Sequence, residues 1–197
     1  MFDALLPLLL FVLVATISPG GATTLATASG ANFGWWRSVP LLSGISFGLA
    51  TMAAAAAAGL GGLILAAPSL QLAMKVFGSV YLLWLAVQIA RRGAPGTATA
   101  AKQPSRFFTG VALLWQNPKA WAMTLSAAAS FASLAHSPVA LAALLGLVFA
   151  AFSMTSLAIW CVAGLVLARA LKTDLQWRIL NRSLAALLVA SIVPIWM

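Results

Sequence analysis

Residues 5–28 read LLPLLLFVLVATISPGGATTLATA, an uncharged stretch that is interrupted by Pro19. Because about 20 residues of helix cross a bilayer core, this stretch is long enough to span a membrane. A proline inside a helix lacks a backbone N–H and clashes with the carbonyl four residues earlier, so Pro19 predicts a helix break that frees the carbonyl of Ala15. Lipid cannot hydrogen-bond to such a carbonyl. A break at membrane depth therefore predicts surrounding protein or a water-filled cavity beside it.

A second interruption of the same kind lies at Asn117-Pro118-Lys119, inside a predicted helix at 107–134. Pro118 frees the carbonyl of Leu114 there. At about 1.5 Å per residue, Pro19 lies about 21 Å and Pro118 about 17 Å from the predicted helix starts. Both depths fall in the inner part of a bilayer core that is about 30 Å thick. Two breaks at this depth are typical of carriers, whose central site is formed by discontinuous helices.

The composition predicts an all-α integral membrane protein. Hydrophobic residues make up 63% of the chain, charged residues make up 7%, and the mean hydropathy is +1.05, which a soluble domain does not reach. Turn residues divide the chain into six predicted transmembrane helices, at 5–28, 39–65, 70–90, 107–134, 139–168 and 179–196.

The six helices predict two halves of one membrane domain. Residues 1–92 form the first three-helix half, residues 93–106 form a cytoplasmic linker rich in Gly, Pro, Ala and Thr, and residues 107–197 form the second half. Since three spans are an odd number, the second half must cross the membrane in the opposite sense. This topology predicts an inverted 3+3 repeat with broken helices 1 and 4, although the two halves show no residue-by-residue similarity.

The basic residues predict the orientation, because short cytoplasmic loops retain Lys and Arg. All but Lys75 and Lys119 of the eleven Lys and Arg flank three connections, as Arg37, Arg91, Arg92, Lys102, Arg106, Arg169, Lys172, Arg178 and Arg182. Both termini are therefore expected outside, in a multi-pass protein of the bacterial inner membrane. The net charge of +9 does not indicate nucleic-acid binding, because these charges lie at helix ends without a soluble domain.

Acidic and metal-binding residues are scarce. The chain has one His, one Cys, no Glu, and two Asp at positions 3 and 174, so we expect no enzyme activity, no metal site and no cofactor. The cationic side chain of a basic substrate, such as lysine, would find no carboxylate in the cavity to offset the cost of its desolvation. Outward movement of a positive charge against an inside-negative potential costs a further ~2.3 kcal/mol per 100 mV. A neutral small-molecule substrate is therefore favoured over a basic one.

The chemistry of a broken helix suits an amino-acid zwitterion, because free N–H groups and carbonyls complement its two charges. We expect the N–H groups of Gly20 and Gly21 to face the carboxylate, and the Ala15 carbonyl with the Thr16 and Ser18 hydroxyls to lie near the ammonium. Some residues keep two interpretations. Lys119 either contacts substrate or the gating network, or it snorkels or only ties the break together. Asn117 either caps the break or contacts substrate, and Tyr81 either packs or lines the site. The complete predicted site is Ala15, Thr16, Ser18, Pro19, Gly20, Gly21, Tyr81, Asn117, Pro118 and Lys119.

Three motifs resemble those of the LysE/RhtB family of amino-acid exporters. Ser18-Pro19-Gly20 resembles its Ser/Thr-Pro-Gly-Pro signature, Gly78-Ser79-Val80-Tyr81-Leu82 its Gly-x-x-Tyr-Leu, and Asn117-Pro118-Lys119-Ala120 its Asn-Pro-Lys. The resemblance covers almost the whole chain and implies export of amino acids or related metabolites across a bacterial inner membrane. Gly21 replaces the second proline of the signature and Ala22 stands where many relatives have Asn, which implies a more flexible and less polar site.

Two other functions remain open at this point, a channel and a non-transporting membrane scaffold or subunit. The Ala- and Leu-rich helices lack the continuous polar lining of a pore, and a scaffold does not explain two midplane breaks. Gly44 and Gly48 form a G-x-x-x-G pattern that permits close helix contact, either inside the carrier or in a homodimer.

Overall fold

The computed structural model describes residues 2–60, 68–91, 105–190 and 192–196. Regular structure in these ranges is helical throughout, which confirms the predicted all-α class. The elements are α1 (Phe2–Ile17), α2 (Gly21–Ala55), the π-helical turn η1 (Ala56–Leu60), α4 (Pro68–Ala90), α5 (Phe107–Trp115), α6 (Pro118–Ser130), the 3₁₀ turn η2 (Ala132–Leu134), α7 (Pro138–Ala170), α8 (Asp174–Ala190) and α9 (Val193–Trp196).

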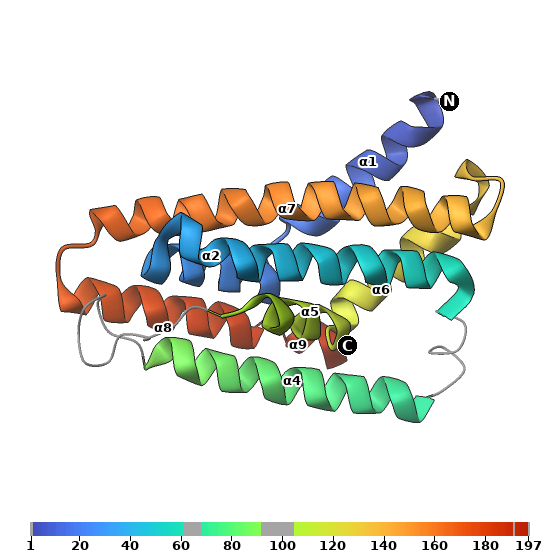
Figure 1. Cartoon of the computed structure of the whole chain (residues 1–197). Coiled ribbons are helices and arrows are strands. Elements are labelled where there is room, and N and C mark those ends of the chain that lie inside the picture. Colours follow the sequence, from blue (N-terminus) through green and yellow to red (C-terminus); the bar gives the residue numbers. More distant parts are fainter. Residues whose placement is uncertain (1, 61–67, 92–104, 191, 197) are drawn as a thin grey trace.

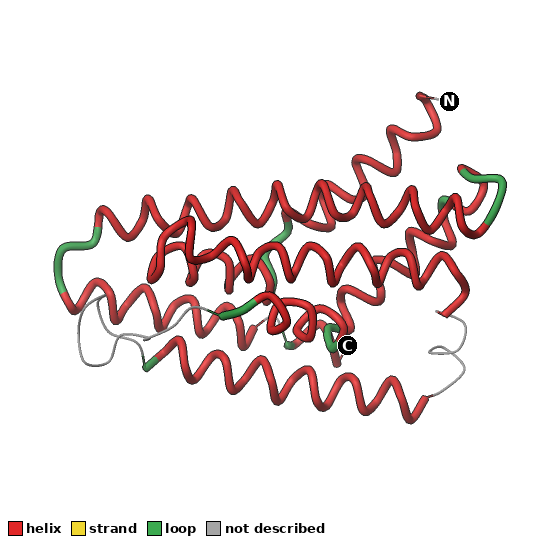
Figure 2. Tube along the Cα trace, viewed as in Figure 1, coloured by secondary structure: helices red, strands yellow, loops and turns green. Residues whose placement is uncertain are grey.

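Both predicted helix breaks are present. α1 ends at Ile17 and α2 begins at Gly21, and Figure 2 shows the connection as a short loop midway along the bundle. α5 ends at Trp115 and α6 begins at Pro118. Pro118 is the first residue of α6, where its fixed φ and missing N–H suit the first turn of a helix but not its interior. Pro19 lies in the loop just before Gly20, the N-cap of α2.

Two predicted helix boundaries were wrong, those of the fourth and the last helix. The predicted separation of the first helix from the second is present inside α2, where Gly34 has a non-helical φ of 76° and ψ of −179°, a left-handed φ that favours glycine. The fourth helix ends at Ser130 rather than at 134. The last begins at Asp174 rather than at 179, and Arg178 and Arg182 lie on its exposed side. The predicted segment 61–65 and most of the predicted linker lie outside the described residues.

The long helices α2 and α7 form the centre of the bundle, with α5 and α6 on α2 and the pair α4 and α8 alongside (Figure 1). Glycines allow the closest contacts. A Cβ at Gly30 would collide with the backbone of Cys161, and one at Gly164 would collide with the backbone of Thr27. Gly44 and Gly110 make the equivalent close approach between α2 and α5. The G-x-x-x-G pattern therefore packs inside the chain, as small residues do between membrane helices.

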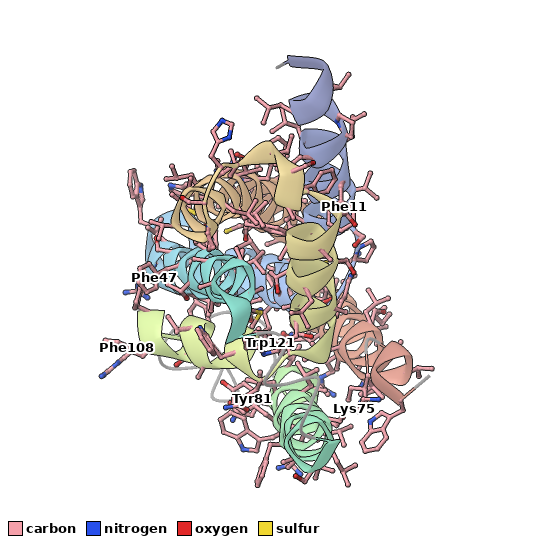
Figure 3. All side chains as sticks on the ribbon, turned by 90° about the vertical axis from the view of Figure 1, so that its right-hand side faces the viewer. Phe11, Phe47, Lys75, Tyr81, Phe108 and Trp121 are labelled. Atoms are coloured by element: carbon pink, nitrogen blue, oxygen red, sulfur yellow. The ribbon has the colours of Figure 1, made fainter. Side chains whose placement is uncertain are left out.

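Polarity is distributed as expected for a protein surrounded by lipid. Large apolar side chains are exposed on α1, α4 and α7, such as Val14 at 65%, Phe77 at 67% and Leu147 at 72%. Hydroxyl side chains are buried instead, among them Thr16, Thr23, Thr27, Ser46, Thr124, Ser153 and Ser156. In the view of Figure 3, Phe108 lies at the periphery and Trp121 lies inside. Within the described part, the two helices at Gly21–Gly59 and Pro138–Ala170 are long and apolar enough to cross a membrane.

The Gly30 contact gives a test of the packing. Gly30→Ala should destabilise the protein by ~1–3 kcal/mol, because the new methyl group meets a backbone carbonyl that cannot rotate away. The unfolding midpoint in detergent should fall by about 2–4 °C per kcal/mol. Gly146→Ala is the matched control, because its Cβ would lie 3.4 Å from the nearest atom, the Ala50 oxygen. Equal midpoints for the two variants would contradict the packing described here.

Candidate substrate site at the two helix breaks

A cavity of ≈ 50 Å³ lies where the two helix breaks meet, measured as the space open to the centre of a water-sized sphere. A single water needs ~10–15 Å³ on this measure, so the cavity has room for more than one. Its described lining comes from α1, α2, α5, α6, α7 and the two breaks: Ala15, Thr16, Ser18, Gly20, Gly21, Ala22, Thr23, Ile45, Leu49, Leu114, Asn117, Lys119, Ala120, Met123, Ser153 and Leu157.

Lys119 joins the two breaks. Its Nζ donates to Ser18 Oγ at 3.0 Å and to the Pro19 carbonyl at 3.4 Å. The side chain can approach this closely because Gly20 carries no Cβ, and an added Cβ would lie 3.3 Å from Nζ. A lysine ammonium at membrane depth needs a polar cavity or partners, and the α1 break supplies both. These two bonds link α6 to the α1 break, and a role of Lys119 in contacting substrate or a gate stays a prediction.

The backbone of the α1 break is largely paired within the protein. The Gly20 N–H donates to Thr23 Oγ1 at 2.8 Å, and Ser18 Oγ donates to the Ala15 carbonyl at 3.1 Å. The predicted free donor at Gly20 and free acceptor at Ala15 are therefore engaged in this structure. Local side chains satisfy the groups that the proline frees, as expected for backbone buried from water.

Helix α7 supplies two more partners to the same break. Ser156 Oγ donates to the Thr16 carbonyl at 2.8 Å, and the Trp160 indole N–H donates to the Ile17 carbonyl at 3.1 Å. These are carbonyls of the last turn of α1, which have no partner inside their own helix. α7 thus fixes the end of α1 against the cavity.

The α5–α6 break is closed by similar means. Asn117 Oδ1 accepts from the Lys119 backbone N–H at 3.0 Å, which makes Asn117 the N-cap of α6 with Pro118 at the first helical position. The capping interpretation of Asn117 is confirmed. The Trp121 indole N–H donates to the Trp115 carbonyl at 3.0 Å, and the Asn117 N–H donates to the Leu114 carbonyl at 2.9 Å.

The structure brings nine of the ten predicted site residues to the breaks. Seven line the cavity, namely Ala15, Thr16, Ser18, Gly20, Gly21, Asn117 and Lys119, while Pro19 contributes its carbonyl and Pro118 begins α6. Tyr81 lies outside the lining. Its ring stacks on Trp84 of α4, with centroids 5.7 Å apart, and it packs against the core.

Sequence reasoning missed the contribution of α7. Ser153 lines the cavity, and Ser156 and Trp160 cap α1. Ser153, Ser156 and Trp160 lie three and four residues apart along α7, so they share one face of the helix. That spacing was the available signal.

The charges of the site are simple. Among the described lining residues, Lys119 is the charged one, and the others offer hydroxyls, amides, backbone groups and apolar surface. No group of three or more His, Cys, Asp or Glu in the described part could hold a metal. The site can therefore bind an anionic group through Lys119 and satisfy other polar groups through neutral oxygens.

A second, wider cavity of ≈ 490 Å³ lies beside the turn between α6 and α7. Its described lining is mostly alanine, with the exposed His136 at the rim: Ala56, Ala57, Leu125, Ala128, Ala129, Ala132, Ala135, His136, Ser137, Pro138 and Leu141. Helix α6 contributes to both cavities, so it connects the central site with this end of the bundle.

Comparison with known proteins gives two matches of different extent. A cysteine/O-acetylserine efflux protein of Klebsiella pneumoniae is 31% identical over 188 residues, which cover 95% of this chain and 94% of that protein. An uncharacterized membrane protein of Vibrio cholerae is 32% identical over 91 residues, which cover 46% of this chain and 44% of that protein. No solved structure matches the chain.

The family model described as LysE type translocator matches residues 13–191, a range that includes both helix breaks and every residue of the central cavity. This match agrees with the resemblance of the three motifs. The chain therefore belongs to the LysE type translocators, and it is a multi-pass membrane protein of a transporter family.

Proposed function

We propose that this protein exports amino acids or related small metabolites across the bacterial inner membrane by alternating access, with neutral substrates favoured over basic ones. The observation that carries the proposal is the cavity at the junction of the two helix breaks, crossed by the Lys119 ammonium. The family and the name of the Klebsiella pneumoniae relative, a cysteine/O-acetylserine efflux protein, support the same substrate class.

The chemistry of the cavity favours a small neutral zwitterion. Lys119 offers a positive charge to the carboxylate, and the hydroxyl and carbonyl oxygens of the α1 break suit the ammonium. A basic side chain would add a second cation to a cavity whose described lining holds no carboxylate. The volume of ≈ 50 Å³ also suits a small substrate.

The packing supports an inverted 3+3 repeat with six spans. If the two halves exchange, the first helix corresponds to the fourth, the second to the fifth and the third to the sixth. The part of α2 before the Gly34 kink belongs to the first span, and it contacts α7 at Gly30 and Gly164. That contact then corresponds to the contact of the fourth helix with the second at Gly110 and Gly44. The third and sixth helices, α4 and α8, pack against each other, so an exchange of the two halves leaves this contact unchanged. Rocking of such halves about a central site is the usual basis of alternating access.

A channel and a non-transporting scaffold agree less well with the site. The cavity is small, and the contact between Lys119 and Ser18 crosses it, so it does not form an open polar path. A scaffold would not need hydrogen bonds from three separate helices around a proline break. Saturable exchange of substrate across vesicles would support a carrier over both alternatives.

The arrangement of charges supports cytoplasmic placement of the α7–α8 end. This turn and the end of α4 lie at one end of the bundle, and the α6–α7 turn and the start of α1 lie at the other (Figure 1). Arg91, Arg169 and Lys172 are exposed at the first end, and the turn at 131–137 has no Lys or Arg. Both termini would then be outside.

Substrate preference can be measured in vesicles that contain purified protein. We expect saturable efflux of L-cysteine and O-acetylserine and little efflux of L-lysine, because the cavity cannot neutralise a second cation. Preloaded vesicles with a counterflow readout check this directly. Preferential release of lysine would contradict the assignment.

Lys119→Met should abolish export while the protein still inserts and folds, because the variant keeps the aliphatic side chain and loses the ammonium on Ser18. Efflux rate and membrane content are measured together. Lys75→Met is the matched control, since Lys75 lies 6.0 Å from the centroid of the Trp196 ring, away from the cavity. Wild-type export by Lys119→Met would remove this residue from the mechanism.

Orientation can be tested with single cysteines placed in a Cys161→Ala background, since Cys161 is buried and is the one cysteine of the chain. A membrane-impermeant maleimide added to intact cells stripped of outer membrane should label His136→Cys and spare Lys172→Cys. Lysed cells should label both, because both positions are exposed. The reverse pattern in intact cells would invert the proposed topology.

A further inference from the structure

We propose that the Lys119 ammonium is a built-in occupant of the subsite for the substrate's amino group, and that substrate binding moves this ammonium onto the substrate's carboxylate. The inference rests on the proposed function and deepens it, because it says how the site recognises both ends of a neutral amino acid.

The first argument concerns the oxygens of the α1 break. The carbonyls of residues 15–17 each accept a hydrogen bond from a hydroxyl or an indole N–H. The Gly20 carbonyl accepts from the Thr24 N–H and the Thr23 hydroxyl. Ser18 Oγ and the Pro19 carbonyl remain as acceptors that meet an ammonium, and in this structure that ammonium is Lys119 Nζ.

The second argument is the shape of the subsite. A Cβ on Gly20 would lie 3.3 Å from Lys119 Nζ, so the bare glycine is what leaves this side of the break open to an ammonium. A lysine ammonium and an amino-acid ammonium are the same chemical group, each with three N–H donors and no acceptor. Both therefore require the same set of neutral oxygens.

The third argument is electrostatic. Ser18 Oγ and the Pro19 carbonyl carry no net charge, so Lys119 has no anionic partner at the break. A substrate carboxylate would be the first anion to reach it, because the two acidic residues of the chain stand at positions 3 and 174. A hydrogen bond between ammonium and carboxylate is stronger than one to a neutral oxygen. The Lys119 ammonium therefore moves to the substrate carboxylate, and Ser18 Oγ and the Pro19 carbonyl become free to accept from the substrate ammonium.

This exchange also changes how two helices are connected. In the empty site, Lys119 of α6 is bonded directly to the α1 break. In the loaded site the substrate stands between them, so the hydrogen-bonded link between α6 and the α1 break runs through the substrate, while Phe11 of α1 still packs on Phe131 at the end of α6. Contacts of α1 with Ser156 and Trp160 do not involve Lys119, so α1 stays fixed to α7 during the exchange.

The test uses three probes that differ in their charged ends: L-cysteine, N-acetylcysteine without an ammonium, and cysteamine without a carboxylate. Binding is measured on the purified full-length protein under reducing conditions, by titration and by the ligand-dependent shift of the unfolding midpoint. For the wild type we expect L-cysteine to bind most tightly, N-acetylcysteine more weakly, and cysteamine at least about tenfold more weakly than N-acetylcysteine, because a lone cation meets Lys119.

Lys119→Met should reverse this order. Once the resident ammonium is gone, cysteamine finds Ser18 Oγ and the Pro19 carbonyl vacant, and its dissociation constant should fall at least about tenfold relative to the wild type. N-acetylcysteine should lose binding. Adding Ser18→Ala to Lys119→Met should remove much of the cysteamine gain, and Lys75→Met should keep the wild-type order. Lys119→Gln, which keeps a polar side chain, provides the same comparison if Lys119→Met does not fold.

The outcomes separate this inference from the proposed function. Cysteamine binding that is equal in the wild type and in both Lys119 variants would overturn the inference, even if the wild type exports L-cysteine. A wild type that binds cysteamine as tightly as N-acetylcysteine would overturn it without any variant. If the wild type exports none of the proposed substrates but the Lys119 variants gain cysteamine binding, the subsite stands and the proposed function fails.

Discussion

Backbone polar groups inside a membrane must be hydrogen-bonded by the protein, and this constraint governs the architecture around the two proline breaks. Each break leaves carbonyls without partners in their own helix, and each receives a tryptophan indole N–H at the end of the preceding helix. Trp160 of α7 serves the α1 break, and Trp121 of α6 serves the α5 break. The carbonyls at the ends of α1 and α5 are therefore hydrogen-bonded within the protein before any substrate binds.

The same constraint explains the close packing of the helices. Some buried hydroxyls bond to carbonyls on neighbouring helices, as Ser46 of α2 does at the Ala150 carbonyl of α7, 2.8 Å away, and Ser156 of α7 does at the Thr16 carbonyl of α1. Such bonds require the backbones to approach closely, and Gly30 and Gly164 allow this. Hydrogen bonding and small-residue packing thus support each other between these two helices. The apolar side chains left outside then meet lipid.

The sequence predicted the breaks and the site on α1 and α6 because proline acts locally. Pro19 and Pro118 interrupt a helix wherever it packs, so their effect can be read without tertiary information. The hydrogen bonds that satisfy the breaks come instead from other helices, far away in the sequence. Ser156 lies 140 residues from its carbonyl partner, and Lys119 lies 101 residues from Ser18, so neither bond follows from local sequence. Helix boundaries failed where the context decided them, as in α8, which begins at Asp174 rather than at the predicted residue 179.

The distance along the chain between the α1 carbonyls and their partners has a consequence for synthesis. Thr16 and Ile17 leave the ribosome long before Ser156 and Trp160, which follow 140 and 143 residues later. At ~5–20 residues per second, the interval is about 7–28 s. During that time these two carbonyls must be hydrated or shielded by the insertion machinery. The amino-terminal half therefore matures only after the carboxy-terminal half has entered the bilayer.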